Sequence, residues 1–112
     1  MAVNPENIKS QMRKGFVEYA VLLILNRQAA YSSEIITKLK EGQFIIVEGT
    51  LYPLLTRLKK AELLNYNWKE STQGPPRKYY EITETGQNFL EELETNWIEI
   101  KSIINYLKNK EV

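Results

Sequence analysis

One short region interrupts a chain that is otherwise patterned for helices, and it limits the folds that the chain can adopt. In LLNYNWKE, residues 63–70, apolar and polar side chains alternate with a period of two, which predicts a half-buried β-strand. STQGPP, residues 71–76, has the glycine and prolines of a turn. RKYYEIT, residues 77–83, returns as a second strand. We therefore expect a β-hairpin among helices, in an α+β, mostly α fold.

Three helices are expected before the hairpin. The first starts at Asn4-Pro5-Glu6, where a capping side chain, a proline and an acidic residue suit a helix N-terminus. Apolar residues at three- and four-residue steps carry this helix to about residue 28. These residues are Ile8, Met12, Phe16, Tyr19 and Leu23. The second helix, capped by Ser32 or Ser33, is expected to end near Gly42.

The third helix is expected over about residues 48–61, and its front is unusual. VEGTLYPLLTRL, residues 47–58, holds a glycine and a proline near its start. Glycine and interior proline disfavour a helix by about 1 and 3 kcal/mol relative to alanine. The leucines nevertheless keep helical spacing, so one side of this helix is expected on the core. They are Leu51, Leu55 and Leu58.

Thr83 is expected to cap a long last helix, whose apolar residues recur at steps of 3, 4, 3, 4 and 3. They are Leu90, Leu93, Trp97, Ile100, Ile104 and Leu107. This spacing is the a/d seam of a coiled coil. Such a seam packs on its own domain or on a second chain. We expect a homodimer, because the preceding helices and hairpin supply a small core without it. The predicted domains are residues 1–83 and a C-terminal dimerisation helix, residues 84–112.

The composition of the 112 residues excludes several kinds of chemistry. Cysteine and histidine are absent, which removes disulfides, thiol nucleophiles, Cys/His zinc sites and Ser-His-Asp triads. We expect no enzyme, no metal site and no cofactor. No apolar run approaches the roughly 20 residues of a membrane span, and nothing at the N-terminus reads as a signal peptide. We therefore expect no membrane partner and a cytoplasmic location.

The charge is divided along the chain. Residues 1–83 carry 12 Lys and Arg against 8 Asp and Glu, a net of +4, and residues 84–112 carry 3 against 6, a net of −3. A polyanion therefore suits the first part rather than the second. The acidic residues Glu91, Glu92 and Glu94 are interpreted as a solvated helix face.

Three helices followed by a hairpin with a basic strand is the order of a winged helix-turn-helix. In helix-turn-helix proteins the recognition helix meets DNA with its N-terminal residues. Small and hydroxylated residues let that end approach phosphates. This would explain the glycine and the proline near the start of the third helix. Arg77 and Lys78 would form a wing that meets phosphates or the minor groove. The alternative is a winged-helix module that binds another protein without sequence-specific DNA binding, since +4 is modest for a DNA binder.

Four segments resemble the PadR family of bacterial transcriptional regulators. They are KGFVEYAVLLIL, EGTLYPLLTRL, NWKESTQGPPRKYYEIT and TETGQNFL. The resemblance covers nearly the whole chain from Lys14. It implies a winged helix domain with a C-terminal helix that forms a homodimer. It further implies a repressor that binds a pseudo-palindromic operator in double-stranded DNA, and that a small-molecule effector or another signal releases it.

The resemblance also assigns individual positions. The front of the recognition helix is matched by Glu48, Gly49, Thr50, Tyr52 and Pro53, and the wing by Gly74, Pro75, Arg77 and Lys78. Thr56 and Arg57, one turn further along the third helix, complete the predicted DNA-binding set. Trp97 resembles the aromatic that lines a cavity at the dimer centre in some members, so it is the predicted contact of a small aromatic effector.

Two positions depart from the family pattern. Glu62 stands where the family usually has a glycine, so either it adopts a left-handed backbone, at a cost of about 1 kcal/mol, or the third helix ends differently. Ser32 and Ser33 replace the usual glycine and aromatic, and we do not expect them to contact DNA. Two aromatics also have alternative interpretations: Tyr52 as a core residue, and Trp68 as a wing residue that packs toward the core.

Overall fold

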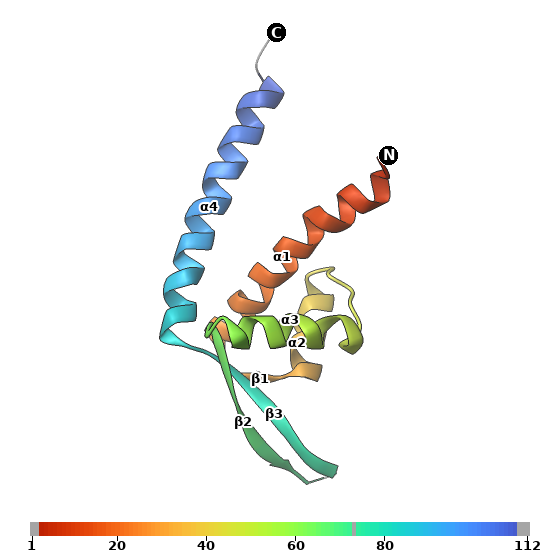
Figure 1. Cartoon of the computed structure of the whole chain (residues 1–112), viewed down its shortest axis with the longest axis vertical. Helices are drawn as coiled ribbons and strands as arrows, with labels where there is room; N and C mark the ends of the chain where they lie inside the picture. Colours follow the sequence, from red (N-terminus) through yellow and green to blue (C-terminus); the bar gives the residue numbers. More distant parts are fainter. Residues whose placement is uncertain (1–2, 73, 110–112) are drawn as a thin grey trace.

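The computed structural model describes residues 3–72 and 74–109. In chain order its elements are α1 (Pro5–Arg27), β1 (Ala30–Tyr31), α2 (Ser32–Glu41), α3 (Glu48–Lys60), β2 (Leu64–Ser71), β3 (Gly74–Ile82) and α4 (Glu84–Asn109). Helices α2 and α3 lie at the centre, the β2–β3 hairpin projects to one side, and α1 and α4 diverge on the other (Figure 1). The expected order of three helices, a hairpin and a long last helix is confirmed. Residue 73 of the expected turn and residues 110–112 of the expected last helix lie outside the described residues.

The hairpin belongs to a three-stranded antiparallel sheet in the order β1-β3-β2. Tyr66 pairs with Tyr80 across the hairpin, and Tyr31 of β1 pairs with Tyr79 of β3. Strand β1 was not expected, because a strand of two residues is too short to show a period. Strand β3 begins at Gly74, so the prolines expected in the turn lie in the first residues of a strand, a position that tolerates proline.

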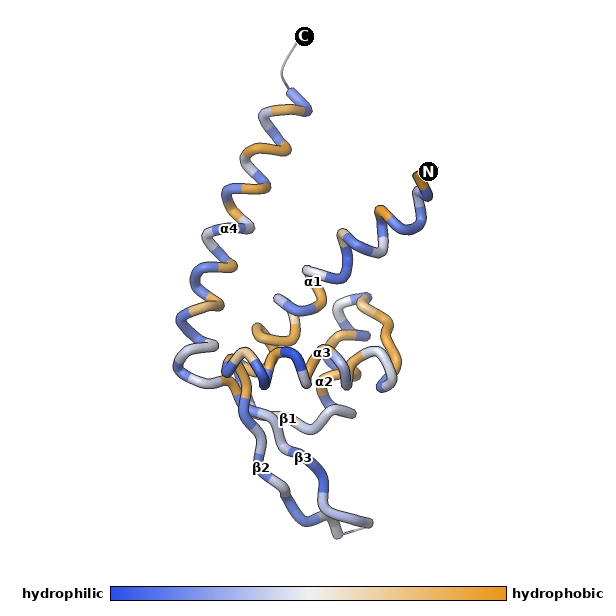
Figure 2. Tube along the Cα trace, in the orientation of Figure 1, coloured by the Kyte–Doolittle hydropathy of each residue, from blue (hydrophilic) through white to orange (hydrophobic). Residues whose placement is uncertain are grey.

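One apolar core joins the helices to the base of the hairpin. It comprises Val17, Val21, Leu22, Leu25, Ala30, Ile35, Leu39, Leu51, Leu54, Leu55, Leu58, Leu63, Leu64, Tyr80 and Leu90. Figure 2 shows the corresponding hydrophobic positions where the lower half of α1 meets α2 and α3. The prediction that the leucines of α3 face the core is confirmed. Leu54 joins them, because a wide apolar stripe rather than a narrow one is buried.

The core-facing side of α1 is not the stripe whose spacing predicted the helix. Ile8, Met12 and Leu23 of that stripe are exposed, and the buried residues of α1 are Val17, Val21, Leu22 and Leu25. Helix α1 carries two apolar stripes, and its N-terminal half extends beyond the core (Figure 1). On the first stripe Phe16 meets Trp97 of α4 edge to face, with ring centroids 5.4 Å apart.

The helix ends follow local side-chain chemistry. The side chain of Asn4 accepts a hydrogen bond from the Glu6 amide at 3.0 Å, as expected. Helix α2 begins differently: Tyr31 is the capping residue, not Ser32 or Ser33, and its amide donates to Glu34 Oε1 at 2.9 Å. A glutamate three residues beyond the cap residue competes well for that amide, so the first serine already lies inside the helix.

The end of α3 and the start of α4 meet at a junction made by four residues. Glu62 adopts φ 64°, so of the two alternatives the left-handed backbone is the one found. The Thr83 hydroxyl donates to the Glu62 carbonyl at 2.6 Å and accepts from the Gly86 amide at 2.9 Å. The Thr83 amide donates to the Leu63 carbonyl at 3.1 Å. The expected cap at Thr83 is therefore confirmed, and it also anchors α4 to the end of α3.

Gly86 lets α4 lie directly against the Leu63 backbone. A Cβ at this position would overlap the Leu63 carbonyl oxygen and lie 2.7 Å from Ile82 Cγ1. Backbone atoms cannot move aside as a flexible side chain can. The close approach of α4 therefore depends on the missing side chain. No helix among the described residues is both long and apolar enough to cross a membrane.

We expect Gly86→Ala to destabilise the fold by about 1–3 kcal/mol through overpacking, which lowers Tm by about 4 °C for each kcal/mol in a chain of this size. Thermal unfolding followed by circular dichroism measures the change. Gly15→Ala is the matched control, because a Cβ at Gly15 meets nothing within 4 Å and alanine favours a helix by about 1 kcal/mol over glycine. Equal melting temperatures for the two variants would contradict the close approach of α4.

Candidate nucleic-acid interface

Helix α3 has one buried side and three exposed sectors. Gly49, Pro53, Thr56 and Lys60 follow one another at steps of four, three and four residues, so they share the face opposite the buried leucines. All four are exposed. The first turn has no side-chain cap, because the capping position is Val47. The uncapped N-terminus carries partial positive charge, and the exposed Glu48 lies in that first turn.

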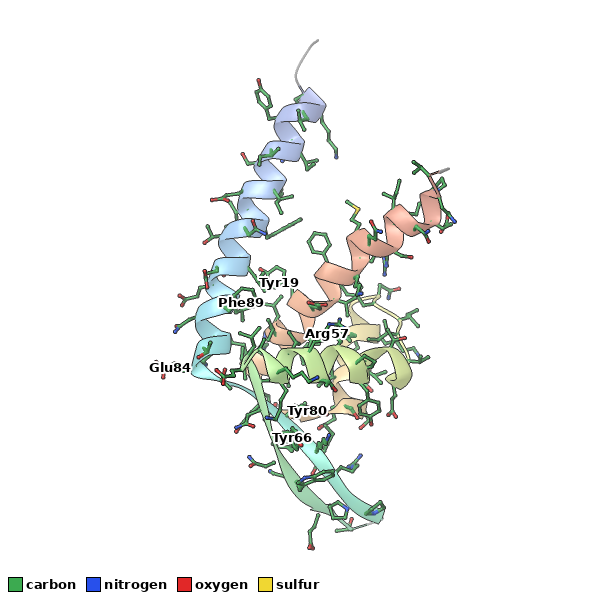
Figure 3. The ribbon with its side chains drawn as sticks, in the orientation of Figure 1. Tyr19, Arg57, Tyr66, Tyr80, Glu84 and Phe89 are labelled. Carbon is green, nitrogen blue, oxygen red and sulfur yellow. The ribbon has the colours of Figure 1, made fainter. Side chains whose placement is uncertain are left out.

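The sector of α3 toward α1 holds Thr50 and Arg57. These residues line a groove of about 520 Å³ together with Arg13 and Lys14 of α1. Figure 3 shows Arg57 on the side of α3 that faces α1. Its guanidinium makes a 3.0 Å ion pair with Glu18. The pair is partly exposed, and such pairs contribute about 0–1 kcal/mol, so a phosphate can compete for Arg57.

The sector of α3 toward the hairpin holds Tyr52 and Lys59. Tyr52 is 45% exposed, so it is not a core residue. Its hydroxyl lies 3.2 Å from Ser32 Oγ, which ties α3 to the start of α2. Lys59 Nζ lies 5.5 Å from the centre of the Tyr66 ring, within the range of a cation–π contact. This sector therefore continues into the surface of the hairpin.

The hairpin has two faces, and the structure separates Arg77 from Lys78. Lys78 lies on the face toward α3, with Nζ 4.5 Å from the Tyr66 ring centre and 5.6 Å from that of Trp68. Arg77 lies on the other face, with Cζ 4.1 Å from the Tyr31 ring centre. The separation follows from the two-residue period of a strand. Gly74, at the start of β3, has φ 155°, a backbone that suits glycine at a turn.

Tyr66 and Tyr80 lie at the base of the hairpin below α3 (Figure 3). Burial raises the pKa of the Tyr80 phenol, and the nearby phenols of Tyr52 and Tyr66 raise it further. The Tyr80 phenol therefore stays neutral at neutral pH and adds no negative charge next to Lys78. The face of the hairpin toward α3 is accordingly aromatic and basic.

Trp68 is the residue that sequence reasoning placed wrongly. It was expected to pack toward the core, but its side chain is 62% exposed. The reason is its place along β2, because the β2–β3 hairpin projects away from the helices (Figure 1). The alternating pattern correctly put Trp68 and Tyr66 on one face, and their rings meet edge to face 6.0 Å apart.

The seam of α4 divides into two parts. Leu90 belongs to the intrachain core at 6% exposure, so it has no surface to offer a second chain, and Leu93 packs partly against the same core. The expectation that Leu90 contacts a partner is corrected on this ground. Further along α4 the apolar residues are exposed, and Figure 2 shows hydrophobic positions continuing to its far end. They are Trp97, Ile98, Ile100, Ile103, Ile104 and Leu107.

Tyr19 of α1 and Phe89 of α4 lie between the two diverging helices (Figure 3). Burial raises the pKa of the Tyr19 phenol, and the Glu94 carboxylate of α4 raises it further. Together with Phe16 and Trp97, Tyr19 links α1 to α4 at the point where the two helices separate. Among the described residues, no cluster of acidic side chains is placed to hold a metal ion.

The comparisons with known proteins agree with this geometry. Residues 21–92 match the family described as "Transcriptional regulator PadR-like family". The chain belongs to the PadR family. An uncharacterised protein of Lysinibacillus sphaericus is 33% identical over 101 residues, which cover 88% of this chain and 93% of that protein. The family is one of transcriptional regulators, which is not an enzyme class.

Solved structures of PadR-like proteins share the fold. A PadR-like transcription factor from Bacteroides fragilis is 59% identical with a TM-score of 0.79, and the match covers 90% of this chain and 98% of that one. A PadR-like transcriptional regulator from Bacillus cereus is 39% identical with a TM-score of 0.77, covering 90% and 99%. The chain is therefore a PadR-like transcriptional regulator with a winged helix-turn-helix fold.

Proposed function

We propose that this PadR-like protein is a homodimeric repressor that binds a pseudo-palindromic operator. Two copies of α3 enter successive major grooves and the hairpins lie beside them as wings. The observation that carries the proposal is the division of α3 into a buried leucine side and an exposed face of small and basic residues. The outward face carries Gly49, Thr56 and Lys60 beside Pro53, and such small and basic residues suit close approach to a groove.

The front of α3 approaches the phosphate backbone. Gly49 lacks a side chain that would hold DNA away, and Thr50 and Tyr52 add hydroxyl donors. Glu48 repels phosphate but accepts a hydrogen bond from the amino group of cytosine, so its proposed contact is with a base edge. Thr56 lies about one helical turn further into the groove than Pro53. Pro53, between Gly49 and Thr56 on the same face, has a compact ring that does not hold the DNA away. Arg57 reaches a flanking phosphate on the side of α1 by releasing Glu18.

The dimer forms through α4 from Leu93 onward. Exposed apolar side chains of this density are uncommon on a monomer surface, and their spacing suits a second copy of the same helix. The proposed contacts are Leu93, Trp97, Ile100, Ile104 and Leu107, with Ile8 and Met12 of α1 alongside. The division of the chain between residues 83 and 84 into two domains stays a prediction. Leu90 of α4 is buried in the core formed by residues 1–83, so α4 packs on that part of the chain as well.

The effector acts at Trp97. Its ring is 38% exposed and lies edge to face with Phe16, so an aromatic compound has two rings to stack against. A ligand between α1 and α4 would change the angle between the winged-helix parts of the two protomers. The repressor would then leave its operator, and the neighbouring operon would be transcribed. We place this regulation in the cytoplasm, where the DNA it controls lies.

DNA binding is tested by fluorescence anisotropy on DNA from the upstream region of the protein's own gene, against scrambled DNA, at several salt concentrations. We expect selective binding that falls steeply with salt, because lysine and arginine displace counterions from phosphates. Weak binding without preference would instead support the protein-interaction module.

Gly49→Ala sharpens this test. A Cβ on Gly49 meets nothing within 4 Å in the chain, so the variant should fold as stably as the parent while its DNA affinity falls about tenfold, or about 1.4 kcal/mol. Gly15→Ala, the same change on an exposed helix surface away from α3, should leave affinity unchanged. An unchanged affinity for Gly49→Ala would remove the front of α3 from the interface.

The dimer is tested by light scattering coupled to size-exclusion chromatography. We expect the parent to elute with twice the 13.1 kDa mass of the chain. Ile104→Asp should give monomers, because a buried unpaired carboxylate is costly. Ser102→Asp adds the same charge two residues away, on nearly the opposite face of α4, and should remain dimeric. A dimeric Ile104→Asp variant, or a monomeric parent, would refute the α4 interface.

A further inference from the structure

Trp68 is an exposed indole with a fixed position. Its side chain is 62% exposed, although it is one of the largest apolar groups in the chain and a tryptophan is usually mostly buried. It is not loose, because the Tyr66 ring meets it edge to face at an interplanar angle of 87° and Lys78 Nζ lies 5.6 Å from its ring centre. An exposed indole beside a lysine suits a partner that offers a flat apolar surface to the ring and a negative charge to the ammonium group.

The face that carries Trp68 is continuous with the exposed sector of α3. A hollow of about 230 Å³ is lined by Tyr52 on α3, by Ser32 on α2 and by five hairpin residues, Trp68, Pro76, Arg77, Lys78 and Tyr80. Arg77 borders this hollow, while its guanidinium lies over the Tyr31 ring on the other face. A second hollow of about 210 Å³ is lined by Lys78 and Tyr66 on the hairpin and by Thr56, Lys59 and Lys60 on α3. Because Lys78 lines both, the recognition helix and this face of the wing form one surface.

The opposite face of the hairpin packs against the start of α2. There the Tyr31 and Tyr79 rings meet with centroids 5.0 Å apart. Arg77 lies over Tyr31, and Lys69 Nζ lies 3.9 Å from the Tyr79 ring centre. Tyr31 is also the capping residue of α2. Both cations of this face are therefore engaged with rings that brace the hairpin against the start of α2.

We propose that the wing contacts DNA with the Trp68–Lys78 face and not with the Arg77 face. The indole packs into the minor groove as an apolar wedge, and the Lys78 ammonium pairs with a phosphate beside it. This inference rests on the proposed DNA binding. It adds a contact residue that is not basic, and it assigns the two neighbouring cations Arg77 and Lys78 to different tasks.

Tryptophan fluorescence tests the contact directly, because the chain has two tryptophans. Trp97→Phe leaves Trp68 as the single tryptophan, and Trp68→Phe leaves Trp97. Each variant is titrated with the upstream duplex, and tryptophan emission is recorded beside the anisotropy of a label on the DNA. We expect the emission of Trp97→Phe to change in step with the anisotropy, and the emission of Trp68→Phe to change much less.

Two failures are distinguishable in that titration. If the anisotropy saturates while the Trp68 emission stays constant, DNA binding stands and the wing contact is overturned. If the anisotropy does not change for the parent protein at any salt concentration, the proposed function itself has failed, and the wing proposal falls with it.

A matched pair of charge deletions assigns the face. Lys78→Ala should weaken DNA binding about tenfold and reduce the salt slope by about one counterion. Arg77→Ala removes the same charge from the adjacent residue. It should lower the melting temperature while weakening DNA binding less than Lys78→Ala does. Trp68→Ala should also weaken binding about tenfold, the size of one lost aromatic stacking contact, whereas Trp68→Phe keeps most of the affinity. A larger affinity loss for Arg77→Ala than for Lys78→Ala would overturn the assignment.

Discussion

The rest of the structure depends on the hydrogen bonds of Thr83. Its hydroxyl joins the Glu62 carbonyl at the end of α3 to the Gly86 amide in the first turn of α4, and its amide holds the Leu63 carbonyl. The recognition helix, the two hairpin strands and the long last helix all begin or end within a few residues of this point (Figure 1). In the proposed dimer, a change in the packing of α4 is therefore transmitted to α3 and to the wing with little flexible chain between them.

Helix α1 serves two surfaces at once. One stripe, with Val17, Val21 and Leu25, completes the winged-helix core. Another stripe, with Phe16 and Tyr19, faces α4. Because both stripes lie on one rigid helix, the DNA-binding part and the proposed dimer interface share a structural element as well as the Thr83 junction. In the proposed regulation, an effector at Trp97 would reach α3 through α4, and through α1 with the ion pair between Glu18 and Arg57.

Local patterns in the sequence predicted the parts of the fold that local chemistry controls. The hairpin, the leucine side of α3 and the cap at Thr83 each depend on a few neighbouring residues, and all three were found. At Glu62 the sequence left two alternatives, and the structure has the left-handed backbone. The spacing that predicted α1 did not indicate which side of the helix is buried, because two apolar stripes allow two orientations and elements far away in the sequence select one of them. The two-residue strand β1 and the cap at Tyr31 likewise depend on β3 and on a competition between neighbouring side chains.

The proposed DNA contacts on α3 and the wing stay predictions. The sequence did not distinguish Arg77 from Lys78, whose side chains contact rings on different faces of the hairpin, and Trp68 was expected toward the core but is exposed. Sheet twist and packing determine which face of the hairpin turns toward α3. Neither can be read from the alternation of apolar and polar residues along a strand. Leu90 is a second example. A heptad pattern does not indicate which of its residues pack in the core of their own chain and which contact a partner chain.

In the proposed complex, two copies of α3 read one face of the DNA through a two-fold dimer. Hydroxyl-radical footprinting on the upstream duplex tests this arrangement. We expect two protected patches related by a dyad, with centres about one helical turn of 10–10.5 base pairs, or a multiple of it, apart on one face of the DNA. A single undivided footprint without two-fold symmetry would contradict it.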